Sequence, residues 1–386
     1  MLRNSDGTIG GFTMESISEK EKMSFVFVHG FQGWGSYDKR YRKMPYWGMR
    51  CGDLIAWLNG KGYHAYAASV SPIGSAWDRA CELYAQLVGT RVDYGAAHSR
   101  EYKHERYGQD YTGRALIPHF DAETKLVLIG HSFGGATNLF TELMANGDTE
   151  ERAATIPDHI SPLFVGGMGN RIKSVAAVAA GQNGNSTYEI PNGYRREGDD
   201  VRIPWWSKLL SFRVTNANRR GADDGRDARD YAEYDMHIDT ARRINQRISV
   251  LPHVLYLSVP CSFTKKNQAG FFVPEKGMEA VFVMRSLQMG RFLGRTKGGV
   301  VLDESWWEND GRVSTISETV PFGAPQTPLD KNKLRAGVWN VYHVHHGDHM
   351  SLQGGLVRKH DIRSFYKEML EMIIGFQEKQ NKCSSE

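Results

Sequence analysis

Cysteine is scarce in this chain of 386 residues, and its four copies lie far apart between Cys51 and Cys383, with no C-x-x-C pair. Such spacing builds neither a disulfide framework nor a thiolate metal site, so we expect free thiols. An excess of one charge is also lacking, because 48 basic and 44 acidic residues leave a net charge of +4. With no long basic run, the composition argues against nucleic acid or an anionic membrane surface as the main partner.

Long apolar segments are missing as well. No run approaches the length of roughly 20 residues that a transmembrane helix needs. The first twenty residues are polar and lack the apolar core of a signal peptide. The chain as written is therefore expected in the cytoplasm, unless an export signal has been removed. Aromatic residues, by contrast, are plentiful (9 Trp, 17 Tyr and 17 Phe), which favours a sizeable core and a broad apolar substrate surface.

A serine at the apex of a strand–turn–helix pattern organises the chain. The branched apolar run at 125–129 predicts a buried strand, and it ends in Gly-His-Ser-Phe-Gly at 130–134, before a helical pattern that closes near residue 147. In this context a G-x-S-x-G motif is typical of the nucleophile turn of an α/β-hydrolase, which lifts the serine hydroxyl above the sheet edge. The alternative is a serine in an ordinary glycine-rich loop. We predict that Ser132 is a nucleophile.

The first buried strand is expected at 24–28, and a second glycine-rich turn follows it. His29, Gly30 and Phe31 begin this turn, and an α/β-hydrolase forms half of its oxyanion hole in a loop of this kind. We expect the backbone N–H groups of Phe31 and of Phe133, the residue after the serine, to stabilise the negative charge of a tetrahedral intermediate. The alternative is a turn with no role in chemistry.

Strand and helix patterns alternate through residue 147, which predicts a parallel sheet with helices on both faces. The expected fold class is therefore α/β, an α/β-hydrolase fold with a mostly parallel central sheet, an insertion and a lid or cap. The predicted segments are strands at 24–28, 63–70, 125–129, 172–180 and 253–258, and helices at 54–58, 75–88, 137–147, 236–249 and from 361 onward.

We expect one domain at 23–378, preceded by a loose leader at 1–22 and followed by a polar tail at 379–386. An insertion is expected at about 75–112. A lid or cap is expected at about 181–235, because this segment is irregular and of mixed polarity yet contains an aromatic cluster. A merely structural insertion is the alternative for the lid.

Three further sets of polar residues are candidates for catalysis or metal binding, but the residue pattern alone does not decide their roles. Asp310 precedes a glycine on a turn, which suits a triad acid, but Asx-Gly turns are common and Asp303 is a competitor. Four histidines crowd the segment 343–349 and could be mistaken for a metal tract. His98 and His104, six residues apart in an aromatic loop, could bind a metal or be ordinary surface histidines.

The segments Trp-Asp-Arg-Ala-Cys-Glu-Leu-Tyr-Ala-Gln-Leu-Val-Gly at 77–89 and Val-Asp-Tyr-Gly-Ala-Ala-His at 92–98 resemble the zinc-containing lipases of the Geobacillus and Staphylococcus type (lipase family I.5). Related clostridial lipases, some of which attack polyesters, are also similar. The resemblance extends from about 24 to 375 and is weakest across the expected lid. It implies a secreted enzyme.

The resemblance implies a zinc ion held by four protein ligands, a set that leaves no position for water and so makes the metal structural. The matching residues are Asp78, His98, His104 and Asp230, with Asp235 a competitor for the last place. Calcium is not predicted, because the acid and the Asp-Pro that bind it in the family are replaced here by other residues. The segment at 181–235 is shorter and more polar than the family's lid, which argues against interfacial activation.

The family's Glu-Asn-Asp-Gly motif selects Asp310 as the triad acid, and its Asp-His pair selects His349 as the base. The expected enzyme is thus a monomeric carboxylic ester hydrolase, a triacylglycerol lipase or esterase, that forms an acyl-enzyme on Ser132. Expected substrates are acylglycerols or shorter acyl esters, including those at a lipid–water or polymer surface. Several relatives carry glutamine at position 133, whereas this chain has Phe133, which could stack on an aromatic acyl group. Aromatic polyesters are therefore a further expected substrate class. An amidase, a thioesterase and a non-catalytic binding protein are the alternatives.

Overall fold

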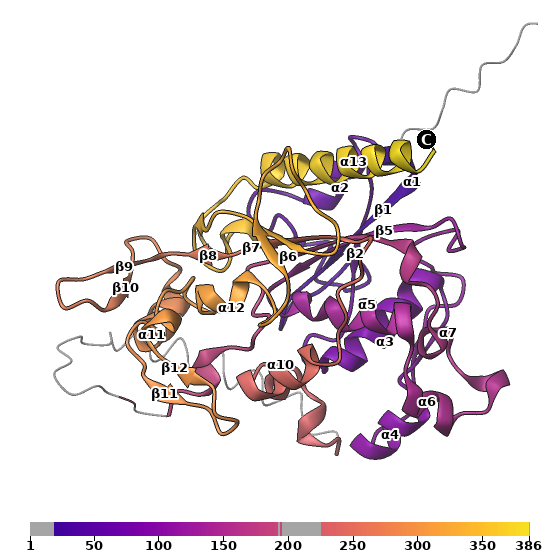
Figure 1. Cartoon of the computed structure of the whole chain (residues 1–386), viewed down its shortest axis with the longest axis horizontal. Coiled ribbons are helices and arrows are strands. Elements are labelled where there is room, and N and C mark those ends of the chain that lie inside the picture. Colours follow the sequence, from indigo (N-terminus) through magenta and orange to yellow (C-terminus); the bar gives the residue numbers. More distant parts are fainter. Residues whose placement is uncertain (1–18, 192–193, 195–224, 386) are drawn as a thin grey trace, which may run out of the picture.

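The computed structural model describes residues 19–191, 194 and 225–385. Its centre is a sheet of seven strands, all of which run parallel to their neighbours (Figure 1). The strands are β1 (Met23–Val28), β2 (His64–Ala68), β5 (Lys125–His131), β6 (Ile172–Val178), β7 (Leu255–Val259), β13 (Gln326–Pro328) and β14 (Trp339–Val341). Their order across the sheet is β13-β14-β7-β6-β5-β1-β2, so the predicted parallel sheet is confirmed.

The central strands are apolar along their whole length because helices cover both faces of the sheet. One face packs against α2 (Leu54–Asn59) and α13 (Arg363–Ser385), which lie above the sheet in Figure 1. The other face packs against α3 (Ala76–Val88) and α5 (Thr137–Asn146), with α10 (Ile238–Asn245) beside them. Alternate residues of β1 and β5 therefore enter two separate cores.

Helical residues lie on both sides of the segment expected as the domain, 23–378. A one-turn helix α1 (Glu19–Lys22) precedes β1, and the Glu19 carboxylate is 2.7 Å from the Lys125 ammonium group. The rest of the expected leader, 1–18, lies outside the described residues. The segment expected as a polar tail, 379–386, is helical as far as Ser385, because α13 continues to that residue. Glu378, Lys379, Gln380 and Lys382 are good helix formers, and no proline stops the helix before them.

The expected insertion at 75–112 contains α3 followed by a small layer outside the main sheet, made of β3 (Arg91–Asp93), α4 (Ala96–Tyr102) and β4 (Tyr107–Asp110). Most of the expected lid, at 192–193 and 195–224, lies outside the described residues. Three of the cysteines (Cys51, Cys81 and Cys261) are buried free thiols. None of the helices in the described part of the chain has the length and apolarity to cross a membrane.

The remaining elements are short and surround the carboxyl edge and the flanks of the sheet. They are the helices α6 (Thr149–Ala154), α7 (Pro162–Val165), α9 (Ala232–Asp235), α11 (Ala280–Met289) and α12 (Thr315–Thr319), and the strands β8 (Cys261–Ser262), β9 (Thr264–Lys266), β10 (Phe272–Pro274), β11 (Gly294–Arg295), β12 (Val301–Leu302) and β15 (His345–His346).

Candidate active site and metal-binding group

Ser132 lies at a strained turn between the end of β5 and a 3₁₀ helix, η1 (Ser132–Ala136). Its φ of 56° is in the left-handed region, which a residue with a side chain adopts only when its surroundings enforce it. The flanking glycines make this turn feasible. A Cβ on Gly130 would lie 2.2 Å from the carbonyl oxygen of Gly134, and one on Gly134 would lie 2.2 Å from that of Val28.

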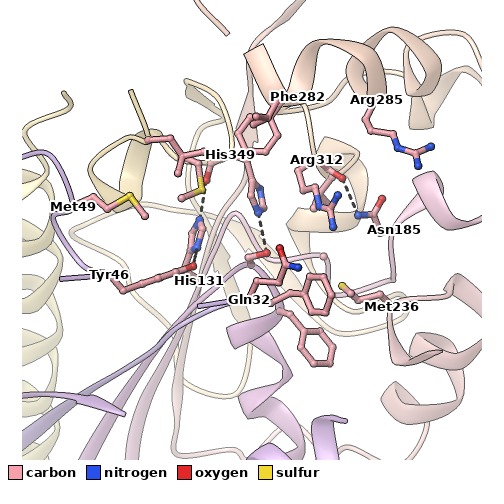
Figure 2. A pocket seen from close by; sticks show the side chains of 18 of the residues that line it. Gln32, Tyr46, Met49, His131, Asn185, Met236, Phe282, Arg285, Arg312 and His349 are labelled. Carbon is pink, nitrogen blue, oxygen red and sulfur yellow. Dashed lines mark hydrogen bonds between the residues drawn. The ribbon is translucent and has the colours of Figure 1, made fainter. Parts of the chain in front are cut away.

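The structure brings the three predicted triad residues together, although they are separated by up to 217 positions in the sequence. The His349 Nε2 atom is 2.9 Å from the Ser132 Oγ, and its Nδ1 is 2.5 Å from the Asp310 Oδ2. His349 and its hydrogen bond toward Ser132 are visible at the centre of Figure 2. Asp303 does not compete, because its exposed carboxylate accepts hydrogen bonds from Ser305 instead.

Asp310 is fully buried yet held in its ionised form. Its Oδ1 accepts hydrogen bonds from the backbone N–H groups of Arg312 and Val313, at 2.8 and 2.7 Å. Burial opposes ionisation, but the charge and hydrogen bond of His349, with the other donors, keep the pKa of Asp310 below its ordinary value. The imidazole therefore faces an anion that fixes which of its nitrogens carries the proton.

Glu318, on α12, is a site residue that the sequence did not reveal. Its carboxyl group is fully buried, accepts the backbone N–H of Cys261 at 2.6 Å and lies within 4.8 Å of the carboxylate of Asp310. Burial, together with the charge of Asp310, raises the pKa of Glu318 well above its ordinary value, so this group is the protonated donor of the pair. No motif marks Glu318, because only the fold brings α12 against the triad acid.

His131 and Tyr46 were also missed, and they connect the loops around the serine. The buried His131 ring hydrogen-bonds to the hydroxyl of Tyr46 at 2.7 Å and to the carbonyl oxygen of His349 at 2.8 Å. Burial lowers the pKa of His131 to about 3, so the ring is neutral. The Tyr46 hydroxyl also accepts the N–H of Gly30 at 3.1 Å, which ties the first glycine-rich loop to the nucleophile turn.

The two predicted oxyanion-hole residues border the same cavity as Ser132. The N–H of Phe31 makes no hydrogen bond within the described part of the chain. The N–H of Phe133 is in the first turn of η1, where backbone donors have no acceptor within the helix. Gly30 has no room for a side chain, since a Cβ there would lie 2.7 Å from that of Ser132.

A cavity of about 600 Å³ opens above the serine and the histidine. Most of the residues in its wall are apolar or aromatic, which is the usual character of a site for a small organic ligand, and the polar side chains beside the triad are Gln32, Arg40, His131, Asn185, Arg285 and Arg312. The side chains that line it include Phe31, Trp34, Arg40, Tyr46, Met49, Phe133, Met236, Val281, Phe282, Arg285, Arg312, Met350 and Leu356.

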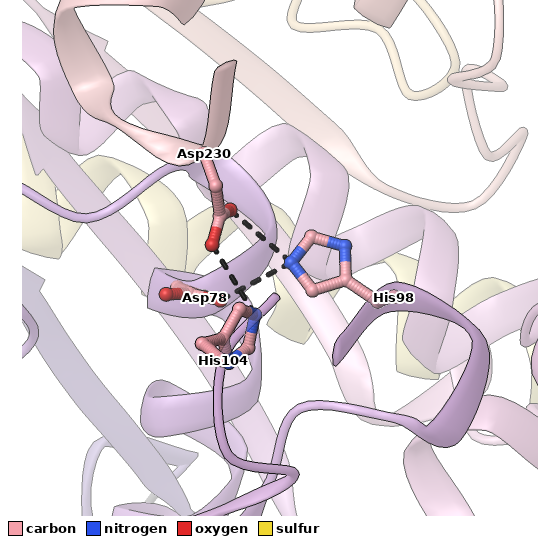
Figure 3. Close-up of side chains that lie close together, drawn as sticks. All are labelled: Asp78, His98, His104 and Asp230. Atoms are coloured by element: carbon pink, nitrogen blue, oxygen red, sulfur yellow. Dashed lines mark hydrogen bonds and ion pairs between the residues drawn. The ribbon is translucent and has the colours of Figure 1, made fainter. Parts of the chain in front are cut away.

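The four predicted metal ligands meet away from this cavity, where the insertion packs against the main domain (Figure 3). Asp78 belongs to α3, His98 to α4, His104 to the loop before β4, and Asp230 to a 3₁₀ helix, η5 (Ala228–Asp230). One ligand atom from each residue lies within 4.8 Å of the other three. Segments more than 100 residues apart thus converge on a group that can hold a metal ion.

The spacing of these atoms fits a tetrahedral ion better than a set of hydrogen bonds. The His98 Nε2 is 3.4 Å from Asp78 Oδ1 and 3.1 Å from Asp230 Oδ1, and the His104 Nε2 is 3.2 Å from Asp230 Oδ2. Ligand atoms about 2.0 to 2.1 Å from a tetrahedral ion are about 3.3 to 3.4 Å apart. Among the described residues, Asp78 Oδ1, His104 Nε2 and Asp230 Oδ2 are buried without a hydrogen-bond partner.

Neighbouring groups orient these ligands. The His104 Nδ1 is 2.9 Å from the carbonyl oxygen of Glu105, an arrangement that leaves Nε2 unprotonated for a metal. Arg226 holds the outer oxygen of Asp78 at 2.5 Å. The competitor Asp235 lies apart from the group of four, because its carboxylate accepts the N–H of Ala76 at 2.7 Å, at the first turn of α3.

The similarity of this chain to known proteins extends over nearly all of it. A family model described as "Lipase-like, C-terminal domain" matches residues 21–193 and 218–382. The chain belongs to this lipase-like family. It is 32% identical over 384 residues to a lipase of Staphylococcus hyicus, covering 92% of this chain and 58% of that protein. It is 31% identical to lipase 2 of Staphylococcus aureus, covering 88% of this chain and 51% of that protein.

Solved structures of lipase-like proteins agree with this assignment. EstA from Clostridium botulinum matches with a TM-score of 0.77 and 30% identity, over 91% of this chain and 87% of that one. Staphylococcus hyicus lipase matches with a TM-score of 0.76 and 28% identity, over 93% of this chain and 97% of that one. The predicted resemblance to staphylococcal and clostridial lipases and the α/β-hydrolase fold class are thereby confirmed. The chain spans about half the length of the curated relatives it matches.

Proposed function

We propose that this lipase-like protein hydrolyses carboxylic esters through an acyl-enzyme on Ser132. The observation that carries the proposal is the continuous relay from the Ser132 hydroxyl through His349 to Asp310, with contacts of 2.9 and 2.5 Å. The relay opens onto a largely apolar cavity that suits the acyl and alcohol groups of an ester. The names of the staphylococcal and clostridial relatives, lipase and EstA, support the same class of reaction.

In this mechanism the His349 Nε2 takes the proton of Ser132 as its oxygen attacks the ester carbonyl carbon. Asp310 orients the ring and stabilises the imidazolium that forms. The N–H groups of Phe31 and Phe133 donate to the oxyanion of the tetrahedral intermediate. His349 then returns the proton to the leaving alcohol, and a water molecule activated by the same ring releases the acid from Ser132.

Acylglycerols and shorter acyl esters are the proposed substrates, since the cavity holds aromatic and thioether side chains rather than a narrow polar cleft. Phe133 lies next to the nucleophile, and the Arg79 guanidinium is 5.2 Å from the centre of its ring. A rigid aromatic wall at this position suits an aromatic acyl group by stacking, which keeps aromatic polyesters among the proposed substrates. Action as a secreted monomer remains a prediction from the family resemblance.

The proposed occupant of the metal group is zinc, held by Asp78, His98, His104 and Asp230. Two imidazoles and two carboxylates form a four-ligand set that zinc accepts, and such a set leaves no position for a water nucleophile. The group lies apart from the residues that line the cavity at Ser132. The proposed role is therefore structural: the ion would attach α4 and the loop at His104 to α3 and η5.

A fluorophosphonate probe tests the proposal, because it forms a covalent bond with an activated serine only. We expect labelling of the wild-type protein at Ser132 and none of the Ser132→Ala variant. A panel of 4-nitrophenyl esters and matched 4-nitroanilides, assayed with both proteins, should show turnover of the esters alone. A folded wild-type protein that is neither labelled nor active would instead be a binding protein, and anilide turnover at a comparable rate would indicate an amidase.

A further inference from the structure

Two arginine side chains border the catalytic cavity on the same side of His349. Arg285 comes from α11, and Arg312 comes from the loop that also carries Asp310. In Figure 2, Arg285 and Arg312 lie to one side of the His349 ring, and Met49 and Tyr46 lie to the other. The two guanidinium groups therefore lie together on one side of the proposed reaction centre.

Neither guanidinium has an acidic partner among the described residues. Arg285 donates to the amide oxygen of Gln288 at 3.1 Å, and the charged neighbour that acts on it most is Arg312. Burial and the positive charge of Arg312 both lower the pKa of Arg285. The carboxylate of Asp310, two positions before Arg312, is already occupied by His349, Glu318 and two backbone N–H groups.

Two like charges that are partly desolvated and have no acidic partner in the described part of the chain are unfavourable unless something compensates them. An anion between them would remove the repulsion and accept charge-assisted hydrogen bonds from planar guanidinium groups, which suit carboxylate and phosphate. A third arginine that lines the cavity, Arg40, differs from Arg285 and Arg312 because an aromatic ring contacts its guanidinium. Its guanidinium stacks on the ring of Trp34 at 3.6 Å and lies among the residues that precede α2.

We propose that Arg285 and Arg312 form a subsite for an anionic group, a carboxylate or a phosphate, carried by the ester that reacts at Ser132. The inference rests on the proposed function and specifies its substrate class. Met49 and Phe282 supply apolar surface for the remainder of the molecule. Half-esters of dicarboxylic acids and acylated alcohol phosphates have this combination of an ester, an apolar part and an anion.

The test compares pairs of esters that differ only in the anion. The carboxylate arm uses 4-nitrophenyl hydrogen glutarate against 4-nitrophenyl methyl glutarate, and the phosphate arm uses 1-butanoylglycerol 3-phosphate against 1-butanoylglycerol. The measured quantity is the ratio of kcat/KM for the anionic ester to that for the neutral ester, with the background rate taken from Ser132→Ala. The arm with the higher ratio identifies the anion.

We expect Arg312→Met and Arg285→Met each to lower this ratio about tenfold or more in one arm, the effect of losing one charged hydrogen bond. Arg312→Lys should retain part of the preference. Arg335→Met, which removes an exposed charge away from the cavity, should leave the ratio within about twofold.

Equal ratios in the wild type and both methionine variants, in both arms, would overturn the subsite while the proposed function stands. If the wild-type protein hydrolyses none of the four esters faster than Ser132→Ala, the proposed function itself is wrong and the subsite fails with it.

Discussion

Two buried carboxyl groups lie against each other at the base of the relay, and they cannot both be ionised at ordinary pH. The contacts decide which one carries the charge. Asp310 faces His349 and accepts two backbone N–H groups, whereas Glu318 accepts one backbone N–H, that of Cys261. The proton therefore resides on Glu318, which becomes a neutral donor that stabilises the Asp310 anion.

Replacing the triad acid tests its assigned role. In Asp310→Asn the amide keeps the size of the carboxylate but can donate to the imidazole, so His349 is no longer held in the correct tautomer. We expect kcat on a 4-nitrophenyl ester to fall about 10³- to 10⁴-fold, as for other triads. The circular dichroism spectrum should be unchanged. Turnover near the wild-type level would assign the acid role to another residue.

Glu318 predicts an unusual dependence of stability on pH. The folded protein keeps the Glu318 proton above pH 4.5, its ordinary pKa, whereas the unfolded chain loses it. Folding thus takes up a proton in this window, and the free energy of unfolding falls as pH rises, by at most about 1.4 kcal/mol per unit from this group. Glu318→Gln cannot ionise, so its stability should fall less between pH 5 and pH 8.

Urea unfolding at four pH values between 5 and 8 measures this difference. Glu304→Gln is the matched control. Because Glu304 is exposed, this variant should show the same pH dependence of stability as the wild type. The same pH dependence in Glu318→Gln and in the wild type would mean that Glu318 is ionised in the folded protein.

At the scale of elements, several polar contacts attach the segment from β3 to β4 to the domain. Two backbone N–H groups at the start of α4 donate to Glu151 of α6, and Arg106 donates to the carbonyl oxygen of His159. The metal group is a further connection, and it links this segment to α3 and to η5. Without an ion, the buried carboxylates of Asp78 and Asp230 would rely on Arg226 and the two imidazoles to offset their charges.

Removing one ligand should therefore loosen the insertion before the rest of the domain. We expect His104→Ala to hold less than half an equivalent of zinc after dialysis, against one equivalent for the wild type, and to lose roughly 5 °C or more in Tm. Hydrogen exchange should increase first in residues 91–110. His64→Ala removes an exposed histidine and should change neither quantity. Full zinc content in His104→Ala would exclude the four-ligand site.

At the scale of the whole molecule, the sequence predicted what depends on local patterns. Burial on both faces of one sheet produces apolar runs in the strands and one apolar face on each covering helix, so these elements have local signals in the sequence. The turn at Ser132 has its own local signal in the flanking glycines. Asp310 and His349 required the family resemblance, because an Asx-Gly turn and a cluster of histidines each have several uses. Glu318 carried no signal at all, because its role depends on a contact between α12 and the loop at residue 310.

The long helix α13 gives the last prediction, since it connects the core to the loop of the catalytic histidine. Tyr366 is fully buried, its ring meets those of Phe27 and Trp47 edge-on at 5.6 and 5.8 Å, and its hydroxyl donates to the carbonyl oxygen of Leu352 at 2.9 Å. Tyr366→Ala should lower the free energy of unfolding by about 3 to 5 kcal/mol, because it leaves a large cavity. Tyr366→Phe keeps the ring and should lose only about 1 kcal/mol.

Urea unfolding followed by tryptophan fluorescence measures both changes, and Lys367→Ala, on the exposed side of the same helix, should alter stability by less than about 1 kcal/mol. If α13 were only a peripheral cover, the Tyr366→Ala protein would unfold at the same urea concentration as Lys367→Ala. A large loss in Tyr366→Ala alone means that the helix completes the core on its face of the sheet.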